Sequence, residues 1–281
     1  MYFWRFIVDT TNLVLGKSTT YQEEYSPSLL QRIERQLGRS AIKNLKSFEG
    51  FDVWHLYELT YLNLNGLPCV CMGCMIVPAK SKYIVESKSL KLYTMSFTMT
   101  RFKDLSFVQK VFERDLSKLL ECKVEVKLYP LHSKDFAIHT IKGTCLEELR
   151  CCKDLNFKNF EYSPEVLAFD DKKEISKTYY TNLFRSLCPV TAQPDYASLM
   201  ICYEGRKLKE ESLLTYLVSL RHHQGFHEQC VELIYSDLVS YLNPKKLTVA
   251  AFFTRRGGID INPVRTNQKS LSPLMLRTIR Q

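Results

Sequence analysis

The sequence predicts an α+β protein built from two similar units, each an antiparallel sheet of four strands with two helices on one face. The order strand, strand, helix, helix, strand, strand can be followed twice along the chain. The strand segments alternate in polarity or are rich in aromatic and β-branched residues, whereas the helical segments keep a 3.6-residue apolar period. The 281 residues suffice for two domains of ordinary size. We place the first unit with its connector at 1–160 and the second at 161–281.

The first unit begins with a predicted hairpin, in which Gly66-Leu67-Pro68 joins an aromatic segment to a returning apolar one. The segment after the helices alternates strictly in polarity and stops at Pro130, as a half-buried strand would. A connector without a clear period follows, from 131 to about 165. In order, we expect strands over 52–65 and 69–77, helices over 86–97 and 105–119, and strands over 123–129 and near 136–141.

The second unit repeats this order. We expect strands over 177–187 and 196–203, helices over 210–221 and 226–242, and strands over 247–254 and from 259 onward.

Two short motifs also support an internal duplication. Ser-x-x-x-Tyr-x-x-Ser begins at Ser89 and again at Ser212, a shift of 123 residues, and Asp-Leu begins at Asp115 and again at Asp237, a shift of 122. Units of this kind leave sheet edges exposed. Two units can pair edge to edge within one chain, and the remaining edges would need another chain. We therefore expect a homodimer.

The charge and the cysteines indicate the surroundings of the protein. A net charge of +9 with a pI near 9.0 favours anionic partners such as phosphorylated cofactors or nucleic acid. Lys and Arg are dispersed without a block of five, so a solvated basic surface explains the charge as well. Ten cysteines without a leader indicate the reducing cytoplasm.

The three cysteines Cys69, Cys71 and Cys74 have a spacing that resembles a metal site. They lie, however, in the uninterrupted apolar run 69–77, and no second Cys/His pair stands at ligand spacing. A buried strand that carries small apolar thiols explains them better. The sequence therefore predicts no metal site.

The N-terminal residues carry two patterns that resemble known motifs but do not meet their requirements. The apolar run Met1–Val8 is too short for a signal segment with its cleavage site, so we expect no targeting or membrane-spanning segment. Gly16-Lys17-Ser18 suggests a phosphate-binding loop, but the glycine that such a loop needs upstream would fall at position 11, which is Thr11. Any nucleotide must therefore be bound without this fingerprint.

The best candidate for chemistry is a stiff loop between two prolines. In Cys188-Pro189 and Gln193-Pro194-Asp195 each proline fixes its own φ near −65° and biases the preceding residue toward extended backbone. Such a loop can aim a thiol and a carboxylate together. A thiolate is a strong nucleophile, and an acid nearby can protonate the group that the thiolate attacks. The same residues could also simply end a strand and cap a turn.

Three further clusters combine charge with a helix start or a turn. Glu86-Ser87-Lys88-Ser89 and His227-Glu228 each open a predicted helix, where capping and the helix dipole offer a structural explanation. Arg255-Arg256-Gly257-Gly258 ends a strand and suggests close approach of the backbone to an anion, although a plain turn explains it equally.

These motifs together resemble one enzyme family. The segments Glu86 to Tyr93 (ESKSLKLY), Cys188 to Asp195 (CPVTAQPD), Phe226 to Glu232 (FHEQCVE) and Thr254 to Pro263 (TRRGGIDINP) occur in the order found in the NADPH-dependent 7-cyano-7-deazaguanine reductases, the nitrile reductases of queuosine biosynthesis known as QueF. The length resembles the long form with two modules. The resemblance covers the chain from Leu15 onward.

The resemblance implies a fold and a reaction. The fold would be the tunnelling fold (T-fold), in which ββααββ modules pair and oligomerise into a barrel. The reaction would be reduction of the nitrile of 7-cyano-7-deazaguanine to an aminomethyl group with two NADPH. The partners would be this small molecule and a second copy of the chain, with no direct nucleic-acid contact and no membrane.

The resemblance also implies roles for particular residues. Cys188 would add to the nitrile carbon as a thioimide-forming nucleophile, and Asp195 would protonate the nitrile nitrogen, which agrees with the chemistry of a thiolate and an acid. The remaining implied contacts are to the base from Val85, Glu86, Ser87, His227 and Glu228, and to NADPH from Ser87, Lys88, Arg256 and Gly257. Because these residues come from both modules, the site should lie between them.

Two other functions remain open at the level of sequence. A zinc-dependent cyclohydrolase of the same fold, acting on GTP, would need Cys230 to converge with His222, His223 or His227 on one metal. A basic module that binds tRNA without catalysis would show a steep salt dependence that is indifferent to Cys188.

Overall fold

The computed structural model describes residues 21–158, 160–270, 272 and 274–281. The interpretations of Met1–Val8 and of Gly16-Lys17-Ser18 concern residues outside this part of the chain. Within it, no helix is long and apolar enough to cross a membrane.

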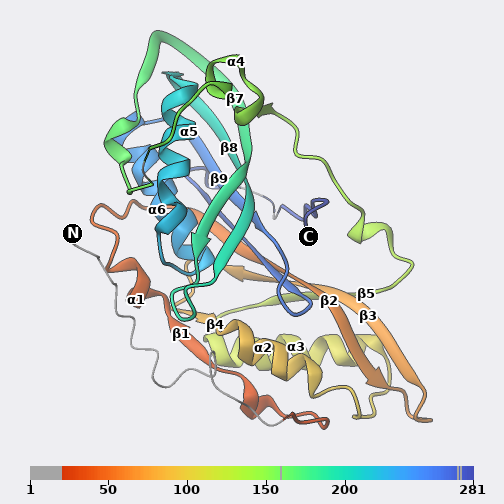
Figure 1. Ribbon diagram of the computed structural model, residues 1–281. Helices are drawn as coiled ribbons and strands as arrows, with labels where there is room; N and C mark the ends of the chain where they lie inside the picture. The colour runs from red at the N-terminus through yellow and green to blue at the C-terminus, as the bar shows by residue number, and fades with distance from the viewer. Residues whose placement is uncertain (1–20, 159, 271, 273) are drawn as a thin grey trace.

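The described residues form the α+β architecture that the sequence predicts (Figure 1). The first half contains η1 (Pro27–Leu29), β1 (Arg32–Glu34), α1 (Arg35–Arg39), β2 (Glu49–Leu62), β3 (Pro68–Pro78), β4 (Tyr83–Val85), α2 (Ser87–Met95), α3 (Leu105–Leu120) and β5 (Glu125–Pro130). The connector contains η2 (Lys134–Phe136), β6 (Thr144–Cys145), η3 (Leu146–Glu148), α4 (Arg150–Lys153) and η4 (Pro164–Val166). The second half contains β7 (Phe169–Leu187), β8 (Pro194–Leu208), α5 (Glu210–Ser219), η5 (Leu220–His222), α6 (His227–Leu242), β9 (Lys246–Phe253) and β10 (Ile259–Thr266).

One eight-stranded sheet runs through both halves in the order β5-β3-β2-β10-β9-β8-β7-β6. The halves meet where β10 pairs antiparallel with β2, from Ile259 opposite Leu56 to Thr266 opposite Glu49. The predicted joining of two units edge to edge within the chain is therefore confirmed. Beside this sheet, β1 and β4 form a separate antiparallel pair.

The four long helices cover one face of the sheet (Figure 1). Side chains of α2 and α3 pack with Trp54 and Leu56 of β2, and side chains of α5 and α6 pack with Leu199 and Val249 in the other half. Paired residues of adjacent strands point to the same face, and Phe51, Val264 and Ala250, which are partners across the junction, form a cluster on the opposite face. Both helix pairs therefore lie on one side.

The internal duplication predicted from short motifs is visible as repeated hydrogen bonds. The hydroxyl of Tyr93 donates to Asp115 Oδ2 at 2.7 Å, and the hydroxyl of Tyr216 donates to Asp237 Oδ2 at 2.6 Å. Burial raises the pKa of Asp237 to about 6. Each aspartate also accepts a hydrogen bond from a second tyrosine, Tyr25 at Asp115 and Tyr162 at Asp237. These two tyrosines begin the identical tripeptides Tyr25-Ser26-Pro27 and Tyr162-Ser163-Pro164, a repeat that was not among the predicted ones.

The cysteine-rich run was interpreted correctly as a strand. Cys69, Cys71 and Cys74 all lie in β3, and the side chains of Cys71 and Cys74 are buried. Burial raises the pKa of the Cys71 thiol to about 12.

The predicted strand near 136–141 is wrong. Phe136 ends a short 3-10 helix, and Ile138 makes only an isolated bridge with Arg277. In the second half the fourth strand, β10, pairs with the third, β9. A fourth strand of the first half would therefore pair with the outer edge of β5. There, the N–H groups of Val126 and Leu128 already donate to side-chain oxygens of α3, those of Glu113 at 3.2 Å and Gln109 at 3.1 Å. The chain instead passes behind the sheet, where Phe136 packs on Tyr57.

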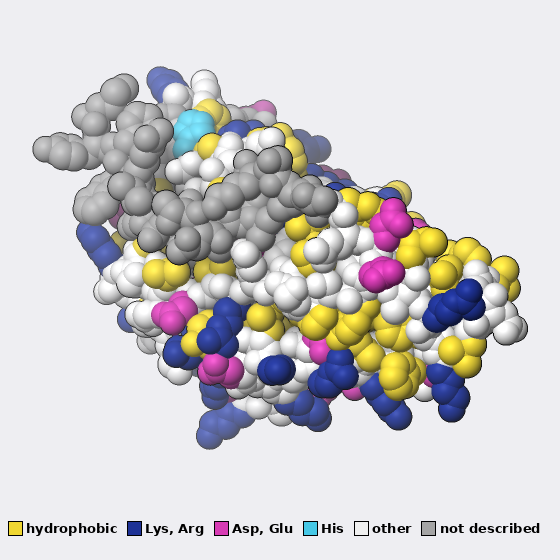
Figure 2. Space-filling view, turned by 90° about the horizontal axis from the view of Figure 1, so that it is seen from below, with side chains coloured by type: hydrophobic (Ala, Val, Ile, Leu, Met, Phe, Trp, Pro, Cys, Tyr) yellow, Lys and Arg dark blue, Asp and Glu magenta, His cyan; other side chains and the backbone are white. Residues whose placement is uncertain are grey.

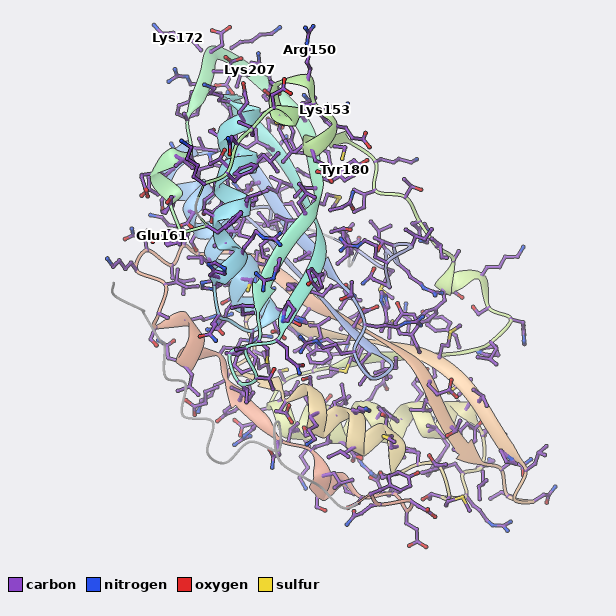
Figure 3. The ribbon with its side chains drawn as sticks, viewed as in Figure 1. Arg150, Lys153, Glu161, Lys172, Tyr180 and Lys207 are labelled. Carbon is purple, nitrogen blue, oxygen red and sulfur yellow. The ribbon has the colours of Figure 1, made fainter. Side chains whose placement is uncertain are left out.

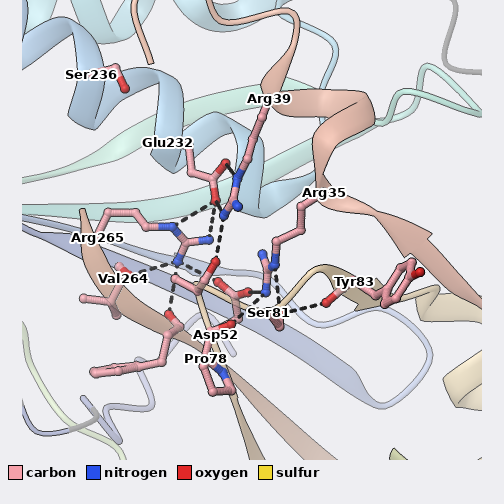
Figure 4. Close-up of polar contacts among 12 residues, drawn as sticks. Arg35, Arg39, Asp52, Pro78, Ser81, Tyr83, Glu232, Ser236, Val264 and Arg265 are labelled. Carbon is pink, nitrogen blue, oxygen red and sulfur yellow. Dashed lines mark hydrogen bonds and ion pairs between the residues drawn. The ribbon is translucent and has the colours of Figure 1, made fainter. Parts of the chain in front are cut away.

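A buried ion-pair network joins the two halves beside the β2–β10 junction (Figure 4). Arg265, whose side chain has no exposed area, donates to Asp52 Oδ1 and to Glu232 Oε1, each at 2.8 Å. Arg35 binds the other oxygen of Asp52 at 2.5 Å, and Arg39 binds Glu232 at 2.8 Å. The network therefore ties β2 and α1 of the first half to β10 and α6 of the second.

The arginines keep both carboxylates ionised. Burial by itself would raise the pKa of Asp52 and of Glu232. The guanidinium groups of Arg265 and Arg35 outweigh burial at Asp52, and those of Arg265 and Arg39 outweigh it at Glu232, so both pKa values lie below their usual range. Removal of one cation would leave buried charge uncompensated.

The substitution Arg265→Leu tests this dependence. We expect it to lower the free energy of unfolding by about 3–5 kcal/mol, because Asp52 and Glu232 would lose their shared cation in a buried place. Chemical denaturation followed by circular dichroism measures the change. Lys80→Ala is the control, since the Lys80–Glu49 pair is exposed and contributes at most about 1 kcal/mol. Equal effects of the two substitutions would contradict the role given to Arg265.

Candidate active site

A cavity of about 320 Å³ opens where the two halves meet. Its base is the junction itself, because Trp54 of β2 and Ile259 and Ile261 of β10 line it. The other lining residues come from both halves: Ile33, Ile84, Val85, Ser87, Lys88 and Lys91 from the first, and Cys188, Pro189, Gln193, Asp195, Gly225, Phe226, His227, Glu228, Thr254, Arg256 and Gly257 from the second. The cavity thus contains every predicted site residue except Glu86.

The loop between β7 and β8 brings the thiol and the carboxylate together. Ser186 pairs with Asp195 in the ladder, and the loop closes when Cys188 N donates to Gln193 O at 2.8 Å and Ala192 N donates to Cys188 O at 3.0 Å. Cys188 and Asp195 are 5% and 4% exposed, so both side chains are nearly dry. Cys188 directly follows the end of β7, close to the strand end expected of it, whereas Asp195 lies within β8 and does not cap a turn.

The carboxylate of Asp195 has two cationic or polar neighbours. Arg256 Nη2 forms an ion pair with Asp195 Oδ1 and donates to the carbonyl oxygen of Pro194 at 3.1 Å. His227 Nε2 lies 3.5 Å from the same Oδ1. The imidazole is stacked on the ring of Phe253, with centroids 3.7 Å apart and planes 3° apart, so its orientation is fixed. Arg256, predicted as a cofactor contact, also holds Asp195.

The paired glycines form a tight turn at the rim of the cavity. Arg256 N donates to Ile259 O at 2.7 Å and Ile259 N donates to Arg256 O at 3.1 Å, with φ of 56° at Gly257 and 85° at Gly258. These left-handed values favour glycine. A Cβ on Gly257 would lie 2.8 Å from the side chain of Lys91, so the lysine of α2 crosses directly over this turn.

Helix α2 brings further cationic groups to the same rim. Ser87 and Lys88 line the cavity at its N-terminus, and Lys91 follows one turn later. Residues three apart on a helix share a face. Sequence reasoning did not select Lys91, although this spacing from Lys88 could have indicated it.

Glu86 is placed differently from the prediction. Its carboxylate caps α2, because Oε1 accepts from Lys88 N at 2.8 Å and Oε2 accepts from Ser89 N at 2.7 Å. The side chain is buried behind the cavity wall, and burial raises the pKa of Glu86 although the two backbone N–H groups oppose that rise. The expected capping role is therefore observed, while contact with a bound base remains a prediction.

Glu228 lines the cavity from the first turn of α6. The residue is 3% exposed, and among the described residues its Oε1 atom has no hydrogen-bond partner. Burial raises the pKa of Glu228, the charge of Asp52 raises it further, and Arg35 and His227 act in the opposite direction. A buried carboxylate in the wall of a cavity is a natural acceptor for N–H groups of a ligand.

The zinc hypothesis finds no ligand set in the described part of the chain. No three His, Cys, Asp or Glu side chains converge there to hold a metal ion. The thiol of Cys230 lies 3.8 Å from the carbonyl oxygen of Gly225, and burial raises its pKa to about 12.

Comparisons with known proteins agree with this geometry. A family model described as "Nitrile reductase, 7-cyano-7-deazaguanine-reductase N-term" matches residues 21–128, and one described as "QueF-like protein" matches residues 194–272. These matches show a nitrile reductase. More particularly, the chain belongs to the QueF family of 7-cyano-7-deazaguanine reductases, enzymes of the queuosine pathway. Among solved structures, an archaeosine synthase QueF-Like in the apo form is similar over 34% of this chain and 95% of its own, with 17% identity and a TM-score of 0.30.

The capping role of Glu86 can be tested through stability. We expect Glu86→Ala to lower the free energy of unfolding by about 1–2 kcal/mol, because two N–H groups at the start of α2 lose their acceptor. Asp104→Ala is the matched control, since Asp104 caps α3 through one bond to Phe107 N at an exposed position. Denaturant midpoints measure both. An unchanged midpoint for Glu86→Ala would refute the cap.

Proposed function

We propose that this protein reduces the nitrile of 7-cyano-7-deazaguanine to an aminomethyl group, with NADPH as reductant, for queuosine synthesis in the cytoplasm. The observation that carries the proposal is the placement of Cys188 and Asp195, both nearly buried, in one cavity between the modules. A nitrile accepts hydride poorly until a nucleophile converts it into an imine-like group. The thiol and the acid supply that conversion.

The covalent step uses these two residues as nucleophile and acid. The Cys188 sulfur forms a bond to the nitrile carbon while one C≡N π bond breaks, and the nitrogen takes a proton from Asp195. The thiol proton replaces the one that Asp195 gave, so the addition to a thioimide is balanced. Two hydrides then add to the carbon, the C–S bond breaks, and two protons from solvent complete the amine and restore the Cys188 thiol. His227 and Arg256 orient the Asp195 carboxyl during these proton transfers.

The base would be read mainly by carboxylate oxygens. Glu228 offers a buried carboxylate in the cavity wall, suited to the ring N–H and exocyclic amine of a 2-aminopyrimidinone. His227 lines the pocket next to it on α6, and Val85 and Ser87 line the pocket from the first half. Each Glu86 oxygen keeps lone pairs beyond the two used for the helix cap, so we retain Glu86 as a second carboxylate for the base.

The rim fits an anionic dinucleotide. NADPH supplies hydride when bound, and its phosphates are attracted to cations and to backbone that approaches without a Cβ. Lys88, Lys91 and Arg256 lie on the cavity wall, and the Gly257 turn is the cradle that a Cβ would fill. We propose that Ser87, Lys88, Lys91, Arg256 and Gly257 hold the cofactor.

The proposal includes no direct contact with nucleic acid. On the face shown in Figure 2, Lys and Arg side chains stand at separate places among acidic and apolar ones. Lys172, Lys207, Arg150 and Lys153 lie at the end of the molecule away from α2 and α3 (Figure 3), and Lys207 pairs with Asp170 at 2.5 Å. We further propose a homodimer. All ten cysteines, each of which the structure describes, are free thiols, which supports the cytoplasmic proposal.

The thioimide can be detected directly. Protein mixed with 7-cyano-7-deazaguanine in the absence of NADPH should gain the mass of one substrate molecule, and Cys188→Ala should not. Asp195→Asn should still form adduct but turn over at least about 100-fold more slowly, because proton transfer contributes factors of that order. Intact mass spectrometry and NADPH oxidation give the two readouts. An unmodified wild-type protein would overturn the proposal, and full activity of Asp195→Asn would remove that residue from its role.

The two adjacent glycines provide a matched test of the cofactor site. Both have positive φ, but a Cβ on Gly257 displaces Lys91 whereas a Cβ on Gly258 would meet nothing nearer than Glu58 Cβ at 4.0 Å. We expect Gly257→Ala to weaken NADPH binding about tenfold more than Gly258→Ala, which corresponds to about 1.4 kcal/mol. The Michaelis constant for NADPH measures this difference. Equal effects of the two substitutions would argue against cofactor contact at Gly257.

A further inference from the structure

A second, much smaller cavity lies behind the substrate cavity. Its volume is about 10 Å³, close to the least that holds one water molecule. Ile84, Phe226 and Glu228 line both cavities, so the Glu228 side chain stands in the wall between them. The remaining lining residues of the small cavity are Glu34, Arg35, Gly38, Gln229 and Glu232.

Arg35 is held rigidly at this small cavity. Its side chain is 3% exposed, Nε donates to Ser81 Oγ at 3.0 Å, and Nη2 donates to Asp52 Oδ2 at 2.5 Å and to Pro78 O at 3.4 Å. Figure 4 shows this guanidinium between α1 and the Asp52 carboxylate. Among the described residues, Nη1 has no partner. The Nη1 group of Arg35 is therefore available to bind a molecule in the small cavity.

Glu228 presents the complementary atom. Its Oε1 is also buried and has no partner in the described part of the chain, and the residue lines the same small cavity as Arg35. A buried donor and a buried acceptor that both lack protein partners each carry a desolvation cost of about 1–3 kcal/mol unless something bridges them. A single water with these two neighbours satisfies both.

On the side of the small cavity, Arg35 is the cation that acts on the Glu228 carboxylate. Glu34 and Glu232 also line the small cavity, and Asp52 lies close enough to raise the pKa of Glu228 together with burial. Glu232 is already bound by Arg39 and Arg265. His227 and Arg35 lower the pKa of Glu228. On the substrate side, the charged or titratable residues that line the cavity are Lys88, Lys91, Cys188, Asp195, His227 and Arg256.

We propose that Arg35 is a positioning residue for the substrate-binding carboxylate: its Nη1 group holds Glu228 Oε1 through one water molecule in the small cavity. The carboxylate is then ionised and presents its other oxygen to the base. Arg35 itself does not touch the substrate. The inference rests on the proposed function, because it assumes that Glu228 binds 7-cyano-7-deazaguanine.

The test is the pH dependence of substrate binding in a Cys188→Ala background, in which no adduct forms. Calorimetry from about pH 5.5 to about pH 8.5 would give the dissociation constant of 7-cyano-7-deazaguanine. Binding should weaken as the pH falls and Glu228 becomes protonated. Arg35→Gln removes a cation that lowers the pKa of Glu228, so the pKa of Glu228 should rise. The loss of affinity should then occur at a pH about one unit higher. Near pH 6 this corresponds to about tenfold weaker binding. Near pH 8.5 the loss should be less than about threefold.

Two further variants separate positioning from folding. Arg39→Gln is the matched control, since Arg39 belongs to the same ion-pair network but does not line the small cavity, and it should leave the pH profile unchanged. In a Glu228→Gln background, Arg35→Gln should cause no shift of the profile. If Arg35→Gln does not fold, Arg35→Lys keeps a cation beside Asp52 and should show a smaller shift in the same direction.

The outcomes are distinguishable from one another. A folded Arg35→Gln or Arg35→Lys variant with the pH profile of its parent overturns the positioning role, as does an equal shift in Arg39→Gln. If the Cys188→Ala parent binds no 7-cyano-7-deazaguanine at any pH, the proposed function fails instead, and the positioning role fails with it.

Discussion

The fold depends on a single buried arginine that serves both halves of the chain. Arg265 has no exposed side-chain area and binds one carboxylate from each half, Asp52 of β2 and Glu232 of α6. Buried charges are tolerated only when they are paired, and without Arg265 only Arg35 would remain at Asp52 and only Arg39 at Glu232. The arrangement requires β10 to lie beside β2, and it therefore fixes the junction at which the two halves become one sheet.

The candidate site is a consequence of the same junction. Trp54 stands two residues from Asp52 on β2, and alternate strand residues share a face, so the network and the cavity base lie on one side of the sheet. On α6, Glu228 precedes Glu232 by one helical turn and hence shares its face. Glu232 completes the ion-pair network, and Glu228 lines the cavity. Arg35 contacts the network through Asp52 and also lines the small cavity beside Glu228.

The two halves have kept their interiors and diverged at their edges. Each retains a buried tyrosine–aspartate pair between its helices, Tyr93 with Asp115 and Tyr216 with Asp237. Within the described residues, the second half adds a fourth long strand to the eight-stranded sheet and the first half does not, because the corresponding edge of β5 is occupied by side chains of α3. That fourth strand, β10, is the one that joins the halves, and the turn before it supplies Arg256 and Gly257 to the cavity.

The sequence by itself determined most element types and the repeat, because periodicity, turn residues and helix caps are local properties. Its motifs and the family they resemble indicated nine of the 20 residues that line the cavity. It indicated Cys188 and Asp195 through the prolines that stiffen their loop, and the hairpin geometry agrees. Only the tertiary structure decided the rest: that Glu86 does not line the cavity, that Lys91 crosses Gly257, and that segment 136–141 leaves the sheet. Those outcomes depend on which partners meet across the junction, and residues far apart in sequence carry no local signal of that meeting.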